Sequence, residues 1–205
     1  MRAMNNTVLE SSAFAGNKRR NIESGSSLLY STATTLFLSK GFHGVSLRKL
    51  GDQLGIHAGS LYHHFESKQA LLFDLLEEHE YALAAALKAV RGATPKIQLL
   101  DFIKRYLSFL SSHSENFQLA VLEHRNLTPN QQVVIRESRE RWQHSLNCIL
   151  QQGKNVGLFA YDDLRCTKTS IIAMLNHLST LEISSTEIIC HGQRQILRML
   201  NPAPG

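Results

Sequence analysis

The stretch GDQLGIHAGSLYHHFESKQALL, from Gly51 to Leu72, constrains the fold more than any other part of the chain. Before it, Ser46 is suited to be an N-cap, and Gly55 is suited to end the short helix that follows in a left-handed conformation. A third helix of only about seven residues, His57 to His64, comes next. Two short helices joined by a tight glycine turn form a helix-turn-helix. The side chains expected in its core are Leu47, Leu50, Leu54, Ile56, Leu61 and Phe65.

Apolar residues recur at helical spacing along the rest of the chain, and no alternation of period two persists. Capping residues, Thr-Pro starts and glycine stops divide this pattern into segments. The sequence therefore predicts an all-α fold of about nine helices. The expected segments are 28–41, 46–55, 57–64, 67–92, one from 94 through 107, 115–126, 128–153, 162–181 and 185–200.

Composition limits the class of protein. The chain has 205 residues, 43% of them hydrophobic, which is enough for a core of one or two domains. Its three cysteines, Cys148, Cys166 and Cys190, lack metal-ligand spacing and predict reduced thiols. No window reaches the roughly 18 apolar residues of a membrane span. We therefore expect a cytoplasmic protein without membrane contact.

Positive charge is concentrated in the first third of the chain. Residues 1–70 carry eight lysines and arginines against four acidic residues, whereas residues 71–205 carry 14 against 13. Such a distribution favours a module that faces a polyanion, joined to a body with another task. Residues 1–23, which end near the cluster Lys18, Arg19 and Arg20, are predicted to be a flexible basic arm, either a plain tail or a DNA contact.

The motif carries a family resemblance. From Phe37 to Leu72 the chain resembles the DNA-binding domain of TetR-type (TetR/AcrR-type) transcriptional regulators. The motif residues are Phe37, Gly41, Phe42, Ser46, Leu47, Arg48, Leu50, Gly51, Leu54, Gly55, Ile56, Gly59 to Phe65, Ser67, Lys68, Leu71 and Leu72. The resemblance implies a helix-turn-helix domain at 24–70 and an effector-binding and dimerisation domain at 71–200.

The resemblance also implies roles for individual residues in binding an operator of double-stranded DNA. Groove and phosphate contacts are expected from Ser46, Arg48, His57, Gly59, Ser60, Tyr62, His63, His64 and Lys68. For His63 and His64, a surface histidine without DNA contact is an equally good interpretation. His57 departs from the serine or threonine that the family usually has as cap, and Gly51 departs from a common alanine.

The larger domain is expected to dimerise and to bind a small, mainly apolar effector. The resemblance implies a homodimer through the last two helices, whose apolar residues occupy more than one face. An aromatic and polar set on the middle helices is the candidate effector site: Phe102, Tyr106, Phe109, His113, Phe117, Leu122, Arg125 and Trp142. Val121 to Pro129 resembles a stretch of members that respond to acyl or steroid-type thioesters. An ordinary helix end before a Thr-Pro start is the explanation that we favour.

No catalytic motif, cofactor fingerprint or paired metal-ligand spacing occurs. We therefore expect no enzyme activity, no cofactor and no metal site. The predicted function is a ligand-responsive DNA-binding regulator, a repressor that the effector releases. Two alternatives stay open. A DNA-binding protein without a ligand would have a solidly packed middle region, and a helical enzyme would have carboxylates or histidines converging there.

Overall fold

A computed structural model describes residues 25–201. In these residues the chain forms nine α-helices, α2 to α10, and one 3₁₀ turn, η2, with no β-strand. The all-α prediction is confirmed. The contacts between residues divide the chain between Glu66 and Ser67 into two compact units. The sequence boundary after residue 70 therefore falls in the first turn of a helix of the second unit.

The first unit holds three helices around a small core. They are α2 (Gly25–Gly44), α3 (Leu47–Leu54) and α4 (Ala58–His64). Gly41 interrupts α2 with a φ of 68°, a value that only glycine adopts without strain, and the chain makes one more turn to Gly44. Leu36, Leu50 and Leu61 are buried where the three helices meet.

One core prediction for this unit is wrong. Ile56 was expected to be buried, but 41% of its surface is exposed. The reason is the turn itself: the Ile56 main-chain N–H donates to the carbonyl of Gly51 at 3.0 Å, and the side chain is left facing solvent. Leu54 is only half-buried, whereas Leu47, Leu50, Leu61 and Phe65 are buried as expected.

The second unit is a bundle of helices with clear start signals. In sequence order they are α5 (Lys68–Leu87), α6 (Pro95–Ser112), α7 (Ser114–Glu123), η2 (His124–Asn126), α8 (Pro129–Asn155), α9 (Leu164–Leu178) and α10 (Ser185–Leu200). Side-chain caps begin five of them, because an oxygen of each cap accepts one of the free N–H groups of the first turn. The caps are Ser67, Thr94, Thr128, Asp163 and Ser184.

Two helix ends differ from the sequence expectation. The long helix ends at Leu87 rather than near Gly92. Instead of one helix over 115–126, α7 ends at Glu123 and the 3₁₀ turn η2 follows. Leu127 then has an extended backbone before the Thr-Pro start of α8. Because the residue before a proline favours an extended backbone, the helix cannot continue into α8 without a break.

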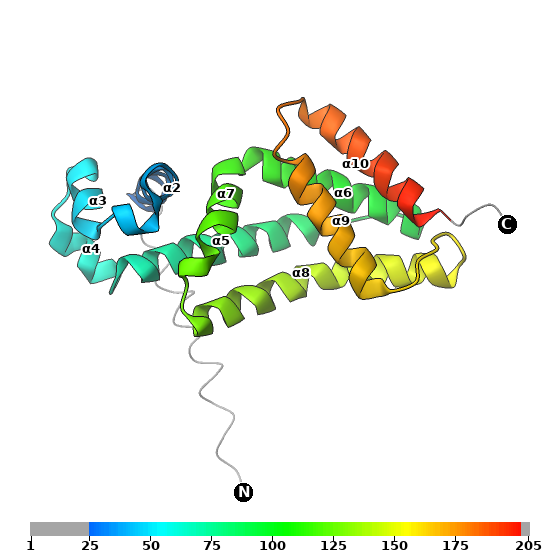
Figure 1. The fold of residues 1–205 in the computed structure, drawn as a ribbon, viewed down its shortest axis with the longest axis horizontal. Helices are drawn as coiled ribbons and strands as arrows, with labels where there is room; N and C mark the ends of the chain where they lie inside the picture. The colour runs from blue at the N-terminus through cyan, green and yellow to red at the C-terminus, as the bar shows by residue number, and fades with distance from the viewer. Residues whose placement is uncertain (1–24, 202–205) are drawn as a thin grey trace, which may run out of the picture. The chain divides into compact units, whose positions relative to one another are not determined.

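Helix α6 lies at the centre of the second unit. It contacts α5, α8, α9 and α10, while α5 also runs along α8 (Figure 1). Its fully buried residues Leu99, Phe102, Ile103 and Leu107 join one hydrophobic cluster to which all these helices contribute. The centre of the unit is therefore filled by side chains of α6.

Candidate functional site

The turn between α3 and α4 positions a short, exposed helix. Ser46 Oγ accepts from the Lys49 N–H at 3.2 Å, and Gly55 ends α3 with a φ of 68°. Gly51 is buried under the turn: a Cβ placed there would lie 2.8 Å from the carbonyl oxygen of Ile56. The two glycines thus allow α4 to approach α3 closely, as the sequence indicated.

Helix α4 turns nearly all of its side chains to solvent. Of its seven residues only Leu61 is buried, and Tyr62 is 56% exposed. A Cβ at Gly59 would meet open space. The predicted DNA-contact residues Ser46, Arg48, His57, Gly59, Ser60, Tyr62, His63 and His64 are all exposed. His57 is the N-cap residue of α4 by position, but its side chain makes no cap hydrogen bond.

The basic side chains near this helix differ in their contacts and in their exposure. Lys49 Nζ donates to the carbonyl of Gly44 at 3.0 Å, whereas Arg48 beside it is exposed at the start of α3. Lys68 is the half-buried first residue of α5, directly after the cap Ser67. The basic cluster at 18–20 lies outside the described residues.

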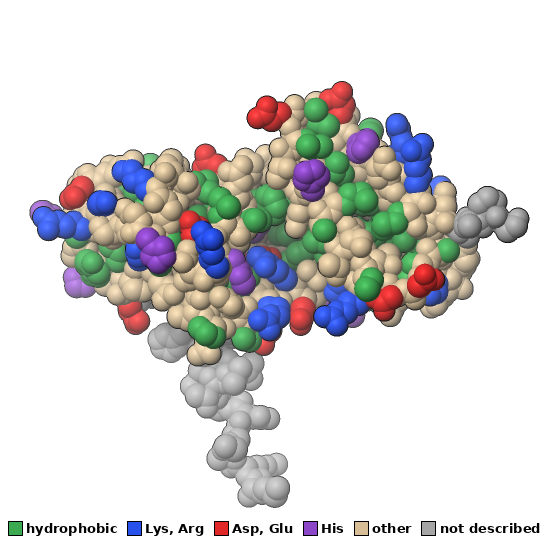
Figure 2. Space-filling view, in the orientation of Figure 1, with side chains coloured by type: hydrophobic (Ala, Val, Ile, Leu, Met, Phe, Trp, Pro, Cys, Tyr) green, Lys and Arg blue, Asp and Glu red, His purple; other side chains and the backbone are tan. Residues whose placement is uncertain are grey.

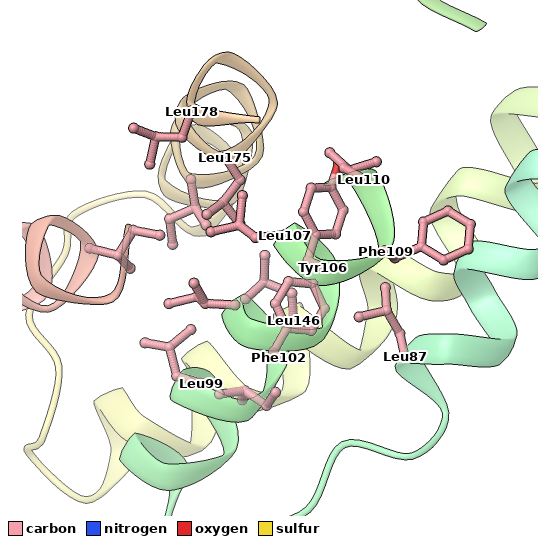
Figure 3. Close-up of a cluster of buried hydrophobic side chains, with 14 of the residues drawn as sticks. Leu87, Leu99, Phe102, Tyr106, Leu107, Phe109, Leu110, Leu146, Leu175 and Leu178 are labelled. Carbon is pink, nitrogen blue, oxygen red and sulfur yellow. The ribbon is translucent and has the colours of Figure 1, made fainter. Parts of the chain in front are cut away.

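Four of the predicted effector residues are part of the packed core of the second unit. Phe102, Tyr106, Phe109 and Trp142 are each at most 8% exposed. Figure 3 shows Phe102 and Tyr106 on α6 among leucines of α5, α8 and α9. The ring centroids of Phe102 and Tyr106 are 5.9 Å apart, and those of Tyr106 and Trp142 are 5.5 Å apart.

The polar atoms of these aromatic side chains are hydrogen-bonded. Tyr106 Oη donates to Asn176 Oδ1 at 2.7 Å, and Trp142 Nε1 donates to Glu80 Oε2 at 3.1 Å. Burial, with the charge of Glu80, raises the pKa of Tyr106 above its usual value. These groups hold α5, α6, α8 and α9 together as a structural core.

The other four predicted effector residues lie nearer the surface. Phe117 is half-buried, and its ring is 6.4 Å from that of His79. His113, between α6 and α7, and Arg125, in η2, are exposed, and Leu122 is 54% exposed. The structure therefore does not bring the eight residues together around one hollow.

Sequence reasoning missed three buried polar residues of the second unit. His79, Glu80 and Glu123 are 5%, 3% and 6% exposed. No burial was predicted for the polar residues of the run EEHEY, but Glu80 stands four residues after Leu76 and three before Leu83, both buried. That helical register could have shown that Glu80 faces the core. Its Oε1 accepts from Arg139 Nε at 2.5 Å.

Two surface hollows occur on the described residues, and both are open to solvent. One, of about 530 Å³, is lined by residues of α8, and the other, of about 470 Å³, by the segment before α9 with residues of α9 and α10. None of the eight predicted effector residues lines either of them. Over residues 25–201, no cluster of three metal-ligating side chains is found. No helix in that range is long and apolar enough to cross a membrane.

Two family models match the chain. The model described as "Bacterial regulatory proteins, tetR family" matches residues 29–75, which include the helix-turn-helix. The model described as "Tetracyclin repressor-like, C-terminal domain" matches residues 92–180.

Curated relatives are similar mainly in the DNA-binding third. The repressor KstR2 of Rhodococcus jostii is 42% identical over 48 residues, which are 23% of this chain and 24% of that protein. KstR2 of Mycobacterium tuberculosis is 26% identical over 137 residues, 65% of this chain and 68% of that protein. The chain thus spans from a quarter to a half of the length of most of the relatives that it matches.

Solved structures share the whole fold. The TetR-family regulator PfmR from Thermus thermophilus has a TM-score of 0.76 at 26% identity, over 85% of this chain and 99% of that one. A tetR-family regulatory protein from Rhodococcus RHA1 has a TM-score of 0.82 at 20% identity, over 88% and 99%. Mycobacterium tuberculosis KstR2, a ketosteroid transcriptional regulator, has a TM-score of 0.76 at 20% identity, over 86% and 95%.

Proposed function

This chain belongs to the tetR family of bacterial regulatory proteins, which are DNA-binding transcriptional regulators, and we propose that it is a homodimeric repressor that a small apolar effector releases from its operator. The single observation that carries the DNA-binding part is the exposure of α4, in which Gly59, Ser60 and the run Tyr62 to His64 are exposed. A helix presented in this way is suited to enter the major groove.

The proposed contacts divide into two classes. Tyr62 and Arg48 are suited to phosphate contacts, which hold the protein on any sequence, whereas Ser60 and His63 are suited to base edges. Selection of duplexes from genomic fragments would identify the operator, and gel-shift titrations at several salt concentrations would then separate the two classes. Replacement of a phosphate contact lowers affinity on all duplexes, and replacement of a base contact changes the preferred sequence.

A matched pair of tyrosines gives the control for this experiment. Tyr62 on α4 is 56% exposed, and Tyr81 on α5 is 66% exposed. Tyr62→Ala should weaken DNA binding about tenfold, a loss of roughly 1.4 kcal/mol, whereas Tyr81→Ala should leave it unchanged. Equal affinities of the two variants would remove α4 from the interface.

A dimer through α9 and α10 is proposed from the apolar residues that these helices do not bury in their own subunit. One face, with Ile171, Leu175, Ile188 and Ile196, lies in the core. Figure 2 shows further hydrophobic side chains on the surface over α9 and α10. Those that are exposed or only partly buried are Leu164, Ile172, Met174, Leu181, Ile183, Ile189, Leu197 and Met199. Two such surfaces related by a two-fold axis would cover one another.

This surface can be tested at Ile189, which is half-buried and lies at the edge of the core. Ile189→Glu would place an unpaired charge in the proposed interface, which costs several kcal/mol, and should yield a folded monomer. Val133→Glu makes the same change at a 43% exposed position of α8 and should remain a dimer. Light scattering and circular dichroism on both variants decide, and a dimeric Ile189→Glu protein would place the interface elsewhere.

Effector control is proposed because α6, α7 and α8 are richer in aromatic and apolar side chains than DNA binding requires. Similar proteins with names such as ketosteroid regulator and fatty acid degradation regulator support an apolar effector. The effector would change the separation of the two recognition helices, which must lie roughly 34–36 Å apart to occupy successive major grooves. A ligand releases DNA only if it binds more tightly to the conformation in which the separation of the recognition helices does not fit the two grooves.

A second candidate, a regulator without an effector, is favoured by the dense packing of Phe102, Tyr106 and Trp142. Thermal-shift screening with fatty acids, acyl thioesters, sterols and ring ketones separates the two. The sensor proposal requires at least one compound that both stabilises the protein and lowers its DNA affinity. If no compound does so, the regulator acts without a ligand.

A further inference from the structure

His79 on α5 is a buried side chain whose ring atom Nδ1 has no hydrogen-bond partner among the described residues. Its imidazole belongs to a residue that is 5% exposed. A buried nitrogen in this state loses its hydrogen bonds to water and gains none in return. A ligand oxygen that bonded to this nitrogen would remove that penalty.

Aromatic rings surround this imidazole and extend to the surface. The ring of Phe109, on α6, is 5.5 Å from that of His79, and the ring of Phe117, on α7, is 6.4 Å away. On its other side Phe109 stacks with His113 at 4.2 Å and an interplanar angle of 15°. Because His113 is exposed and Phe117 is half-buried, the group of rings leads from solvent to His79. Flat ring systems are the ligands that such faces pack against best.

Helix α7 is the element that would move outward to admit a ligand to His79. Of its ten residues only Leu119, Ala120 and Glu123 are buried, while Leu122 and its neighbour Val121 are more than half exposed. Its N-cap residue His113 makes no side-chain cap hydrogen bond. Few buried contacts and an uncapped start lower the free energy of local opening. Because Phe117 belongs to this helix, an outward displacement of α7 would carry its ring away from that of His79.

The charges around His79 define the ligand further. Burial, helped by the positive charges of Arg139 and His113, lowers the pKa of His79 to about 4, so the ring is neutral at neutral pH. Arg139, one of the two groups whose charge acts on His79, donates from Nε to Glu80 Oε1. A buried ligand carboxylate would compete with Glu80 for Arg139 and would pay the cost of desolvation. A neutral oxygen acceptor does not pay that cost.

Resting on the proposed sensor function, we propose that His79 is the polar recognition residue of the effector site and that the effector is a flat ring compound with a neutral carbonyl oxygen. The oxygen accepts from Nδ1–H, and the rings lie between Phe109 and Phe117 after α7 has moved outward. The neutral imidazole has one N–H, so it is a donor at one nitrogen only.

The test uses the full-length protein and three naphthalene probes of the same shape. Calorimetry compares 2-acetylnaphthalene, 2-ethylnaphthalene, which lacks the oxygen, and 2-naphthoate, which carries a charge. The ketone should bind the wild-type protein at least tenfold more tightly than the hydrocarbon, which corresponds to 1.4 kcal/mol. In His79→Phe, which keeps the ring, this ratio should fall to about one because only the ketone loses affinity. In His43→Phe, which makes the same change at an exposed histidine of α2 in the first unit, the ratio should persist.

Several results would overturn this proposal. They are the absence of ketone binding to the folded wild-type protein, an unchanged ratio in His79→Phe, and tightest binding by 2-naphthoate. If His79→Phe fails to fold, nitrogen NMR of the wild-type imidazole decides, because only the ketone should shift the Nδ1 resonance. A gel shift on the same samples keeps the two proposals apart. Ketone binding that leaves DNA affinity unchanged would reject the sensor function alone, and DNA binding without ketone binding would reject the His79 site alone.

Discussion

Gln69 Nε2 donates to the main-chain carbonyl of Asn126 at 2.6 Å, although 57 residues separate them in the sequence. Gln69 lies in the first turn of α5, and Asn126 ends η2. Asn126 Nδ2 in turn donates to the buried carboxylate of Glu123, the last residue of α7. These two bonds connect the C-terminal end of α7 to the start of the helix that directly follows Glu66 in the chain.

A variant that breaks this connection should separate effector binding from DNA release. Gln69→Ala removes the donor, so this hydrogen bond can no longer transmit an outward movement of α7 to the first turn of α5. We expect unchanged affinity for DNA without effector, unchanged effector binding, and a reduction of effector-induced release by about tenfold, or 1.4 kcal/mol of coupling free energy. Gel shifts with and without effector measure it.

The control for Gln69→Ala removes a bond of the same type at another place. Gln132 Nε2 donates to the carbonyl of Leu127 at 3.1 Å, within the start of α8. Gln132→Ala should lower the free energy of unfolding by about 1 kcal/mol, like Gln69→Ala, because each loses one hydrogen bond. It should release DNA normally. A coupling defect in both variants would attribute the effect to stability.

Two glycines of the first unit should respond to alanine in opposite directions. At Gly51 a Cβ meets the carbonyl oxygen of Ile56 at 2.8 Å, so Gly51→Ala must displace the turn and should destabilise the protein by about 1–2 kcal/mol. At Gly59 a Cβ meets nothing within 4 Å, so Gly59→Ala should stabilise α4 by roughly 0.5–1 kcal/mol.

The Gly59→Ala variant also tests whether α4 faces the DNA. If α4 lies in the groove at Gly59, the added methyl group obstructs contact, and Gly59→Ala shows a higher melting temperature with weaker DNA binding. Thermal unfolding and gel shifts on one preparation provide both values. A more stable variant with wild-type DNA affinity would show that Gly59 does not face the operator.

The helix-turn-helix was predictable from the sequence because its determinants are local. The cap Ser46, the turn glycine Gly55 and the spacing of Leu47, Leu50 and Leu61 fix two helices and their turn. Ile56 was misplaced because its position depends on which way the turn projects its side chain, and apolar character does not reveal that direction.

The middle helices were less predictable because their side chains meet partners far away in the sequence. Phe102 and Phe117 have the same character, but one is fully buried and the other is half-buried. Glu80 meets Arg139 and Trp142, 59 and 62 residues away, and no local pattern reveals those partners. Helical periodicity places a residue on a face, and only the packing of the helices determines what that face contacts.

The ion pair of Glu80 with Arg139 should stabilise the second unit strongly. Arg139→Ala would leave Glu80, which is 3% exposed, with the Trp142 N–H as its remaining hydrogen-bond donor among the described residues. We expect the free energy of unfolding to fall by about 2 kcal/mol or more, because an uncompensated buried carboxylate is costly. Urea unfolding followed by Trp142 fluorescence reports it, since this is the single tryptophan of the chain.

Arg141→Ala is the matched control on the same helix. Arg141 is exposed and donates to Ser138 Oγ at 2.8 Å. Its loss should change the free energy of unfolding by less than about 0.5 kcal/mol. Similar values for the two arginine variants would mean that the Glu80 carboxylate is hydrated in the folded protein and does not depend on Arg139.

Stability should fall as the pH is lowered from about 6.5 towards 4, and His79 should account for a large part of this. The folded protein lowers the pKa of His79 to about 4 from the 6.5 of the exposed side chain, chiefly by burial and then by the charges of Arg139 and His113. The unfolded chain therefore binds a proton in this window that the folded protein does not bind. The full contribution of the neutral ring is present above pH 6.5, and the loss by pH 4 is of the order of 3 kcal/mol. Urea unfolding at several pH values measures the slope, which His79→Phe should flatten. Burial also lowers the pKa of His124, so a smaller slope should persist in that variant. An identical pH dependence in both proteins would show that His79 is accessible to water and is not the unpartnered buried base on which the ligand proposal rests.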